Sequence, residues 1–243
     1  MLKPEDAEEV LKNFETNERQ VQRDHAISHV LFALQKIESQ MVFFGGTALA
    51  RTYLPSGRLS EDIDLFTNSR TALSQEINDL PSLIEREFPN ASWALLPSRA
   101  GDAQDIFLRC DDLIQVKMQI VESKTRGWEA VPVQSSVIFQ RYSDVPPTSL
   151  TVPTFDGFIA MKALAWFDRR AARDLFDLEG LSVVHEVTEM ARNVVEQIRG
   201  YPLSGSMMRQ RPIGLWSEEL AHQTKLEKSE AACLARVLEW WGA

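Results

Sequence analysis

The stretch from residue 41 to residue 66 constrains the fold of this chain more than any other part of the sequence. It opens with the apolar run Met-Val-Phe-Phe at 41–44, which predicts a short buried strand. Gly45 and Gly46 follow, and then a helix-like segment over residues 47–53 ends at a Pro-Ser-Gly turn. A strand, a glycine pair and a helix therefore lead into the residues that come next.

Those next residues carry two aspartates, Asp62 and Asp64, at the start of the apolar run Ile-Asp-Leu-Phe. Side chains alternate along a strand, so both carboxylates lie on one face while Ile63 and Leu65 point into a core on the other. Two neighbouring carboxylates repel each other unless a positive charge lies between them, and a divalent cation usually supplies it. The spacing therefore predicts a metal site at Asp62 and Asp64.

The composition is that of an ordinary globular protein. Of the 243 residues, 44% are apolar and 25% are charged, which allows one large domain or two small ones. A formal net charge of −9 argues against a surface that binds nucleic acid without specificity, although it allows a local basic groove. No apolar run approaches the roughly 18–20 residues of a membrane span.

The cysteines and the first residues of the chain indicate its compartment. Cys110 and Cys233 lie far apart and form no Cys-x-x-Cys or Cys/His grouping, so we expect both to be reduced and buried. The first fifteen residues are acidic and amphipathic, unlike a signal peptide. We therefore expect a cytoplasmic protein without membrane contact.

Periodicity predicts the remaining elements. Helical spacing covers residues 4–40 and 69–88, and it returns from 155 onward in segments over 155–168, from about 171, over 182–199 and up to 241. Strands are expected over 93–96, 105–110 and 113–121, with a hairpin turn at Asp111-Asp112. The proline-rich residues 124–154 resemble a linker. We place a domain boundary near residue 150, between a core of residues 1–150 that includes the N-terminal helices and a helical domain of residues 151–243 that completes the active-site cleft.

Two histidines in the first helical segment have a spacing that can hold a metal ion. His25 and His29 stand at positions i and i+4. No acidic partner motif accompanies them in the sequence. We therefore expect surface or packing histidines.

The order of strand, Gly-Gly, helix and Asp-x-Asp strand resembles the nucleotidyltransferase superfamily that includes DNA polymerase beta. Gly45, Gly46, Asp62 and Asp64 match the positions of that signature. Glycine lets the backbone approach a triphosphate, the helix N-terminus offers N–H groups to phosphate oxygens, and paired aspartates hold Mg²⁺. The resemblance implies an α+β fold in which a mixed sheet with flanking helices is followed by a C-terminal helical bundle.

A narrower resemblance covers most of the chain. The segments GGTALARTYL, R-x-S-E-D-I-D-L and K-x-L-A-x(4)-R-x(3)-R-D-L-x-D-L are similar to the AbiEii and MenT nucleotidyltransferase toxins of type IV toxin–antitoxin and abortive-infection systems. Lys162 and Asp174 match an active-site lysine and a catalytic aspartate of that family. The resemblance implies transfer of NMP from an NTP to the 3′ end of tRNA, inhibition of translation, and a cognate antitoxin as partner.

The resemblance also implies roles for particular residues. Asp62 and Asp64 hold Mg²⁺ and position the attacking hydroxyl, Lys162 reaches the nucleotide phosphates, and Asp174 orients Lys162 or acts as a base. The residues expected to bind the nucleotide offer backbone N–H, hydroxyl or cationic groups, and they are Gly45, Gly46, Thr47, Arg58, Ser60 and Lys162. Some family members are silenced by phosphorylation in the nucleotide pocket, for which Ser60 and Thr47 are the candidates.

The sequence departs from the wider superfamily at one point. Many members carry a third carboxylate on a later strand, where this chain offers Lys117 and Gln119. Asp111 and Asp112 lie in the expected turn, too far away to replace it. We therefore expect one Mg²⁺ held by the protein and a second that arrives with the nucleotide.

Two alternative functions remain open from the sequence. The same chemical core serves small-molecule nucleotidyltransferases of the antibiotic-modifying type, and an acidic surface suits a cationic substrate. A nucleotide-binding relative without turnover is the other alternative, because the third carboxylate is missing. Arg169, Arg170 and Arg173 form either an RNA-phosphate contact patch or a solvated helix face, with Asp177 as the partner of Arg173.

Overall fold

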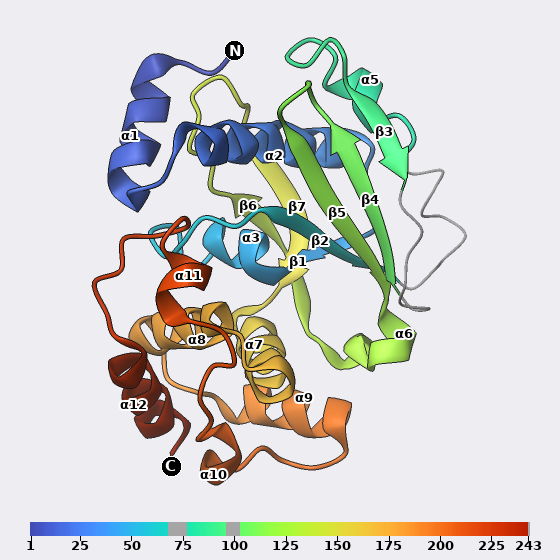
Figure 1. Cartoon of the computed structure of the whole chain (residues 1–243). Helices are drawn as coiled ribbons and strands as arrows, with labels where there is room; N and C mark the ends of the chain where they lie inside the picture. Colours follow the sequence, from blue (N-terminus) through green and yellow to red (C-terminus); the bar gives the residue numbers. More distant parts are fainter. Residues whose placement is uncertain (68–76, 96–102, 243) are drawn as a thin grey trace.

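The computed structural model describes residues 1–67, 77–95 and 103–242, and it is built around a mixed five-stranded sheet (Figure 1). The strands lie in the order β1 (Val42–Phe44), β2 (Asp62–Thr67), β5 (Gln115–Glu122), β4 (Ala103–Arg109) and β3 (Ser92–Leu95). Only the β2–β5 pair is parallel among these four pairings. Its register places Lys117 beside Asp62 and Gln119 beside Asp64.

The two faces of the sheet have different roles, as the alternation predicts. Ile63 and Leu65 of β2 and Met118 of β5 are buried in the main core together with residues of α2 (Glu18–Lys36). The opposite face carries Asp62 and Asp64 and an apolar cluster. Helix α2 follows α1 (Pro4–Phe14) and begins where the Asn17 side chain accepts a hydrogen bond from the Gln20 N–H at 2.9 Å.

The prediction of a linker over residues 124–154 is wrong for most of that segment. A short helix α6 (Ser123–Arg126) and a 3₁₀ turn η1 (Trp128–Ala130) lead into an antiparallel pair, β6 (Val133–Ile138) and β7 (Thr148–Pro153). Strand β7 lies against β1 and α2. Two prolines precede β7 and one ends it, and at these positions a missing N–H does not interrupt the strand pairing. The prolines are therefore compatible with a small sheet, although their number resembles that of a linker.

The C-terminal part is helical, and Figure 1 shows it beneath the sheet. Helix α7 (Phe155–Arg169) packs against α8 (Ala172–Val184) and α9 (Glu189–Arg199), and α8 packs against the last helix α12 (Glu230–Trp241). Short helices α10 (Gly205–Met208) and α11 (Trp216–Leu220) lie between them. Trp166 and Trp241 are buried here, and their indole N–H groups donate to the carbonyls of Met208 and Leu203 at 3.0 and 2.9 Å. Both tryptophans therefore anchor the packing of the helical part.

Several predicted boundaries shift in the structure. Helix α3 (Gly45–Ala50) begins at the glycine pair rather than at residue 47, and the helix expected over 182–199 is α9, because α8 continues to residue 184. Of the helix expected over 69–88, residues 69–76 lie outside the described residues, and the remainder contains the single turn α5 (Leu80–Leu83) with Pro81 near its start. Cys110 and Cys233 are free and buried, as predicted.

One apolar core runs through both halves of the chain. It contains Ala26 of α2, Ile63 of β2 and Trp241 of α12 in a single cluster, so a boundary near residue 150 stays a prediction. Among the described residues, no helix combines the length and apolar character required to cross a bilayer.

A buried arginine connects α3 to α2 and to the segment after β6. The Arg51 guanidinium is fully buried, donates to the Asp24 carboxylate at 2.7 Å, and also reaches the Phe139 carbonyl at 3.4 Å. Removing one partner of such a pair leaves an uncompensated charge in the interior. We expect Arg51→Met to lower the free energy of unfolding by about 3 kcal/mol, measured by urea denaturation.

Arg23→Met is the matched control for Arg51→Met. Arg23 pairs with Glu61 at 2.9 Å near the surface, so its loss is expected to cost less than about 1 kcal/mol. Equal costs for the two substitutions would contradict a structural role for the buried pair.

Candidate active site

The floor of the site is the junction of β1 and α3, where the backbone lies directly against the β2 carboxylates. Gly45 has φ of +79°, which side-chain-bearing residues rarely adopt, and a Cβ there would lie 2.0 Å from Asp64 Oδ2. A Cβ on Gly46 would lie 2.6 Å from Arg58 and 3.0 Å from the Ser60 hydroxyl. The glycine pair therefore brings backbone, carboxylate, guanidinium and hydroxyl groups together in one small region.

Asp62 and Asp64 face the cavity from β2, and their environment disfavours two negative charges. Burial and then the neighbouring Asp62 raise the pKa of Asp64 to about 6, and burial also raises the pKa of Asp62. Neither carboxylate has a hydrogen bond or an ion pair within the described residues. Two partly buried, unneutralised carboxylates on one face are the donor set that a hard divalent cation prefers, so these residues fit Mg²⁺.

The position beside Asp64 carries an amide and not a third acid. Gln119 of β5 lies beside Asp64 of β2 in the parallel register, and its Nε2 donates to Asp105 on β4 at 2.9 Å. The Lys117 ammonium also lies 3.7 Å from the Asp105 carboxylate. Asp105 is therefore held one strand further away from the pair, by two partners of its own.

The opposite wall comes from the helical part of the chain. Lys162 of α7 is nearly buried, and its Nζ lies 2.6 Å from Asp177 and 3.2 Å from Asp174, both on α8. Asp177 also accepts two hydrogen bonds from Arg58, each at 2.8 Å. Gln223 accepts a further bond from Arg58 at 2.7 Å. The Asp177 carboxylate thus holds Arg58, which precedes β2, and Lys162 of α7 at the same time.

Asp174 lies behind Lys162 and does not line the cavity. Its carboxylate is fully buried and accepts two hydrogen bonds from Arg169, at 2.6 and 2.8 Å. Burial acts to raise the pKa of Asp174, but Lys162 and Arg169 outweigh that effect and hold the pKa below its usual range. An anion so tightly paired suits the orientation of Lys162 better than proton abstraction.

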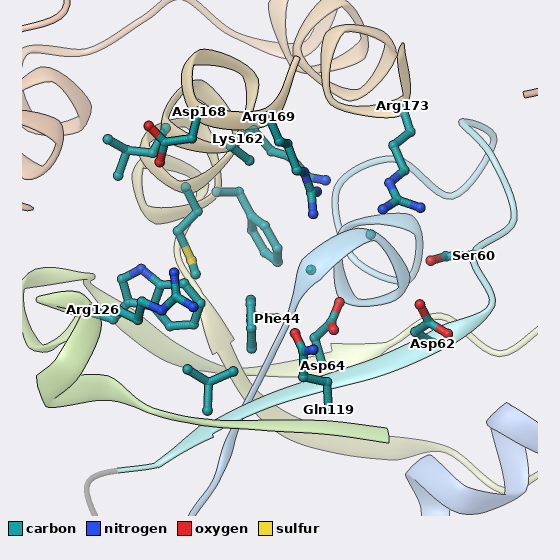
Figure 2. Close-up of a pocket in the computed structure, with 18 of the residues that line it drawn as sticks. Phe44, Ser60, Asp62, Asp64, Gln119, Arg126, Lys162, Asp168, Arg169 and Arg173 are labelled. Carbon is teal, nitrogen blue, oxygen red and sulfur yellow. The ribbon is translucent and has the colours of Figure 1, made fainter. Parts of the chain in front are cut away.

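A cavity of about 690 Å³ separates the two walls. Figure 2 shows Asp62, Asp64 and Ser60 on one side and Lys162 and Arg169 on the other. The cavity continues into an apolar region where Trp128 packs against Phe44 with ring centroids 4.8 Å apart. Seven basic side chains line the cavity against four acidic ones, and they are Arg58, Lys117, Arg126, Lys162, Arg169, Arg173 and Arg199. A locally basic cavity therefore exists in an acidic protein.

Other residues singled out in the sequence lie in different surroundings. Thr47 is buried, lies outside the lining of the cavity, and donates its hydroxyl to the Asp62 carbonyl, so its side chain supports β2 and does not face a ligand. Ser60 does line the cavity. Arg169 and Arg173 line it too, whereas Arg170 lies outside the lining.

Asp177 is the main residue that the sequence reading misplaced. One of the two alternatives for the arginines pairs it with Arg173 one helical turn away, yet it pairs with Arg58 and Lys162. The signal was available in its spacing from Asp174, because residues three apart share a helix face and both carboxylates can then meet one lysine. Gln223 carries no comparable signal in the sequence.

Solved structures define the class of the fold. MenT4, a nucleotidyltransferase toxin from Mycobacterium tuberculosis, superposes with a TM-score of 0.65 at 19% identity, covering 92% of this chain and 83% of that chain. A putative nucleotidyltransferase from H. pylori superposes with a TM-score of 0.52 at 15% identity, covering 90% and 92%. The predicted α+β fold, with a mixed sheet, flanking helices and C-terminal helices, is confirmed as that of nucleotidyltransferase structures.

The family follows from the sequence itself. Residues 29–232 match the family described as "Nucleotidyl transferase AbiEii toxin, Type IV TA system". The chain belongs to this family of nucleotidyltransferase toxins. A search of curated protein sequences found no match.

The close approach of Gly45 to Asp64 can be tested against a second glycine with the same backbone. Gly200 has φ of +82°, but a Cβ there would meet nothing within 4 Å. Gly200→Ala is expected to cost about 1 kcal/mol in unfolding free energy from backbone strain alone. Gly45→Ala adds a collision with the carboxylate, so we expect a larger cost in urea denaturation and a loss of Mn²⁺ binding measured by electron paramagnetic resonance. Equal behaviour of the two variants would contradict the placement of Asp64.

The raised pKa of Asp64 makes a prediction for stability without metal. Between pH 3.8 and about 6 the folded protein retains a proton on Asp64 that the unfolded chain releases, so stability falls as the pH rises through that window. Asparagine cannot ionise and escapes this penalty. In EDTA at pH 7.5, Asp64→Asn should therefore be more stable than the wild type by about 3 kcal/mol in urea denaturation, and the difference should fall below about 1 kcal/mol at pH 4. A difference that persists or grows at pH 4 would show that charge is not its cause.

Proposed function

We propose that this chain transfers a nucleoside monophosphate from an NTP to the 3′ end of tRNA in an Mg²⁺-dependent reaction, and thereby inhibits translation. The observation that carries the proposal is the pair of unneutralised carboxylates, Asp62 and Asp64, facing Lys162 across one cavity. The matched family supports the transferase chemistry and the role as a toxin.

The phosphates of the nucleotide are expected to lie between the two walls. Gly46 offers its backbone N–H in the first turn of α3, Ser60 offers a hydroxyl, and Lys162 offers a fixed ammonium from the opposite side. Asp62 and Asp64 would hold Mg²⁺, and the ion would supply the positive charge that an in-line displacement at a phosphate requires. Asp174 and Asp177 keep Lys162 in position and are positioning residues.

The nucleobase fits the apolar end of the cavity. Phe44 and Trp128 form an aromatic wall there, and Met161 lies beside them. Aromatic side chains stack on the faces of planar rings with little dependence on the identity of the base. This wall supports nucleotide binding without selecting one NTP.

The transfer step forms one bond and breaks one. The terminal hydroxyl oxygen of the acceptor attacks the α-phosphorus, the bond from that phosphorus to the bridging oxygen of the β-phosphate breaks, and pyrophosphate leaves. The hydroxyl proton is released to solvent. The chain's contribution is to align the two reactants and to stabilise the charge on the phosphates.

The acceptor is proposed from the charges around the mouth of the cavity. Arg169 and Arg173 are exposed there, on the helical side, and such side chains can bind the phosphates of an RNA end. A small cationic acceptor is the alternative, favoured by the net charge of −9 over the whole chain.

Type IV toxin–antitoxin membership implies an antitoxin protein as partner. Ser60, which lines the cavity, is the proposed position at which a phosphate would repel the triphosphate.

Labelled nucleotides test the proposal directly. The protein is incubated with each α-³²P-labelled NTP, Mg²⁺ and total tRNA, and in parallel with aminoglycosides in place of tRNA. We expect label at the 3′ end of tRNA, lost on pretreatment of the tRNA with periodate, and an arrest of cell-free translation. Label on the aminoglycoside alone would replace the tRNA proposal with the small-molecule one. Bound nucleotide without any transfer would indicate a non-catalytic relative.

Matched variants connect the activity to the carboxylates. Asp62→Asn and Asp64→Asn should each reduce transfer by about 100-fold or more, because the metal loses a charged ligand. Asp112→Asn, in the exposed turn after β4, should leave transfer unchanged. Full activity in either β2 variant, with the fold verified by circular dichroism, would refute the metal assignment.

A further inference from the structure

Three side chains outside the cavity converge in a small cluster. His25 and His29 lie one turn apart on α2 and are both nearly buried, and Asp144 reaches them from the loop that joins β6 to β7. His25 Nε2 lies 3.0 Å from Asp144 Oδ2, His29 Nε2 lies 3.5 Å from the same oxygen, and the two Nε2 atoms are 3.2 Å apart. Both are packing histidines, one of the two alternatives expected, and their acidic partner comes from more than a hundred residues away.

Hydrogen bonding alone does not satisfy this triangle. A neutral imidazole nitrogen either carries a proton and donates or carries a lone pair and accepts. If both Nε2 atoms donate to Asp144, their two protons oppose each other across the 3.2 Å contact between His25 and His29. If His25 Nε2 instead accepts from His29, its lone pair faces the carboxylate at 3.0 Å. If His25 Nε2 donates to both neighbours, the lone pair of His29 faces the carboxylate at 3.5 Å. With Asp144 ionised, no placement of protons therefore serves all three contacts.

A cation at the centre serves all three contacts at once. Ligand atoms about 2.0–2.1 Å from a tetrahedral Zn²⁺ stand about 3.3–3.4 Å from one another, and the three observed separations bracket that value. Imidazole nitrogen with a carboxylate oxygen is a donor set that suits Zn²⁺. We propose that His25 Nε2, His29 Nε2 and Asp144 Oδ2 form a zinc site that is separate from the Asp62–Asp64 pair.

The surroundings leave one coordination position for another donor. The rings of Phe88 and Tyr142 flank His25 with centroids 6.1 and 5.0 Å away, so two sides of the cluster are aromatic. The N-terminal amine donates to Asp144 Oδ2, the proposed ligand oxygen, at 2.7 Å, and it also donates to Glu87, which places the Glu87 carboxylate next to the cluster. The fourth position of a tetrahedral ion would be open to water or to another donor.

The position of the site in the fold assigns it a structural role. Asp144 belongs to the same loop as Ser143, whose N–H donates to Asp6 of α1 at 2.8 Å. A metal that fixes Asp144 on α2 therefore also fixes the contact between that loop and α1. None of the three ligands lines the cavity, so the ion acts on stability and not on nucleotide transfer.

Metal titration of the full-length chain tests the site. The protein is stripped with a chelator, dialysed, and titrated with Zn²⁺ by calorimetry and with Co²⁺ by absorption spectroscopy. We expect one tight equivalent of Zn²⁺, the intense visible bands of tetrahedral Co²⁺, and a melting temperature raised by about 5 °C at a hundredfold excess of Zn²⁺ over its Kd. A wild-type protein that binds no Zn²⁺, or that gives only weak octahedral Co²⁺ bands, would overturn the proposal.

Variants locate the ion. His29→Gln should weaken Zn²⁺ binding by more than about tenfold and abolish the tetrahedral Co²⁺ spectrum. His185→Gln, at an exposed histidine, and Asp64→Asn, in the cavity, should both retain the spectrum. Asp144→Asn provides a second test if His29→Gln does not fold, since Asp144 lies on a loop. Loss of the spectrum in Asp64→Asn, or its survival in both ligand variants, would place the ion elsewhere.

Discussion

The arrangement of the site depends on the buried carboxylate of Asp177. It accepts two hydrogen bonds from Arg58, which comes from the segment leading into β2, and it lies 2.6 Å from the ammonium of Lys162 on α7. Burying one cation without a partner is costly, and two cations sharing one anion are held in a fixed relation to each other. The side chain of Asp177 therefore joins Arg58 of the sheet wall to Lys162 of the helical wall in a fixed relation.

The sheet wall of the cavity carries negative charge that no side chain in the described part of the chain neutralises. Asp62 and Asp64 lack a neutralising partner among the described residues, and the pKa of Asp64 is raised to about 6 as a result. Lys162 already has two anionic partners and cannot move across to relieve them. In the free protein the two carboxylates therefore repel each other, at the place where a divalent cation would bind together with a triphosphate. Gly45 makes this possible, since any side chain there would occupy the position of the Asp64 carboxylate.

How much of this could be read from the sequence depended on how local each signal was. The alternation of β2 and β5 identified the core face and the site face, and the glycine pair located the junction of β1 and α3. The ion pairs from Asp177 to Arg58 and Lys162 were missed because the first joins residues 119 apart in the sequence, where only tertiary packing decides which charge meets which. The pairing of His25 and His29 with Asp144 could not be predicted for the same reason. Residues 124–154 were misread because prolines at strand ends have the composition of a linker.

The most direct test is a crystal structure of the chain with Mn²⁺ and a non-hydrolysable NTP analogue, located by anomalous scattering. We expect a Mn²⁺ peak between the carboxylates of Asp62 and Asp64, phosphate oxygens between Gly46 and Lys162, and an unbroken pair between Asp177 and Arg58. A nucleotide bound outside this cavity, or Mn²⁺ absent from the Asp62–Asp64 pair while nucleotide is bound, would contradict this expectation.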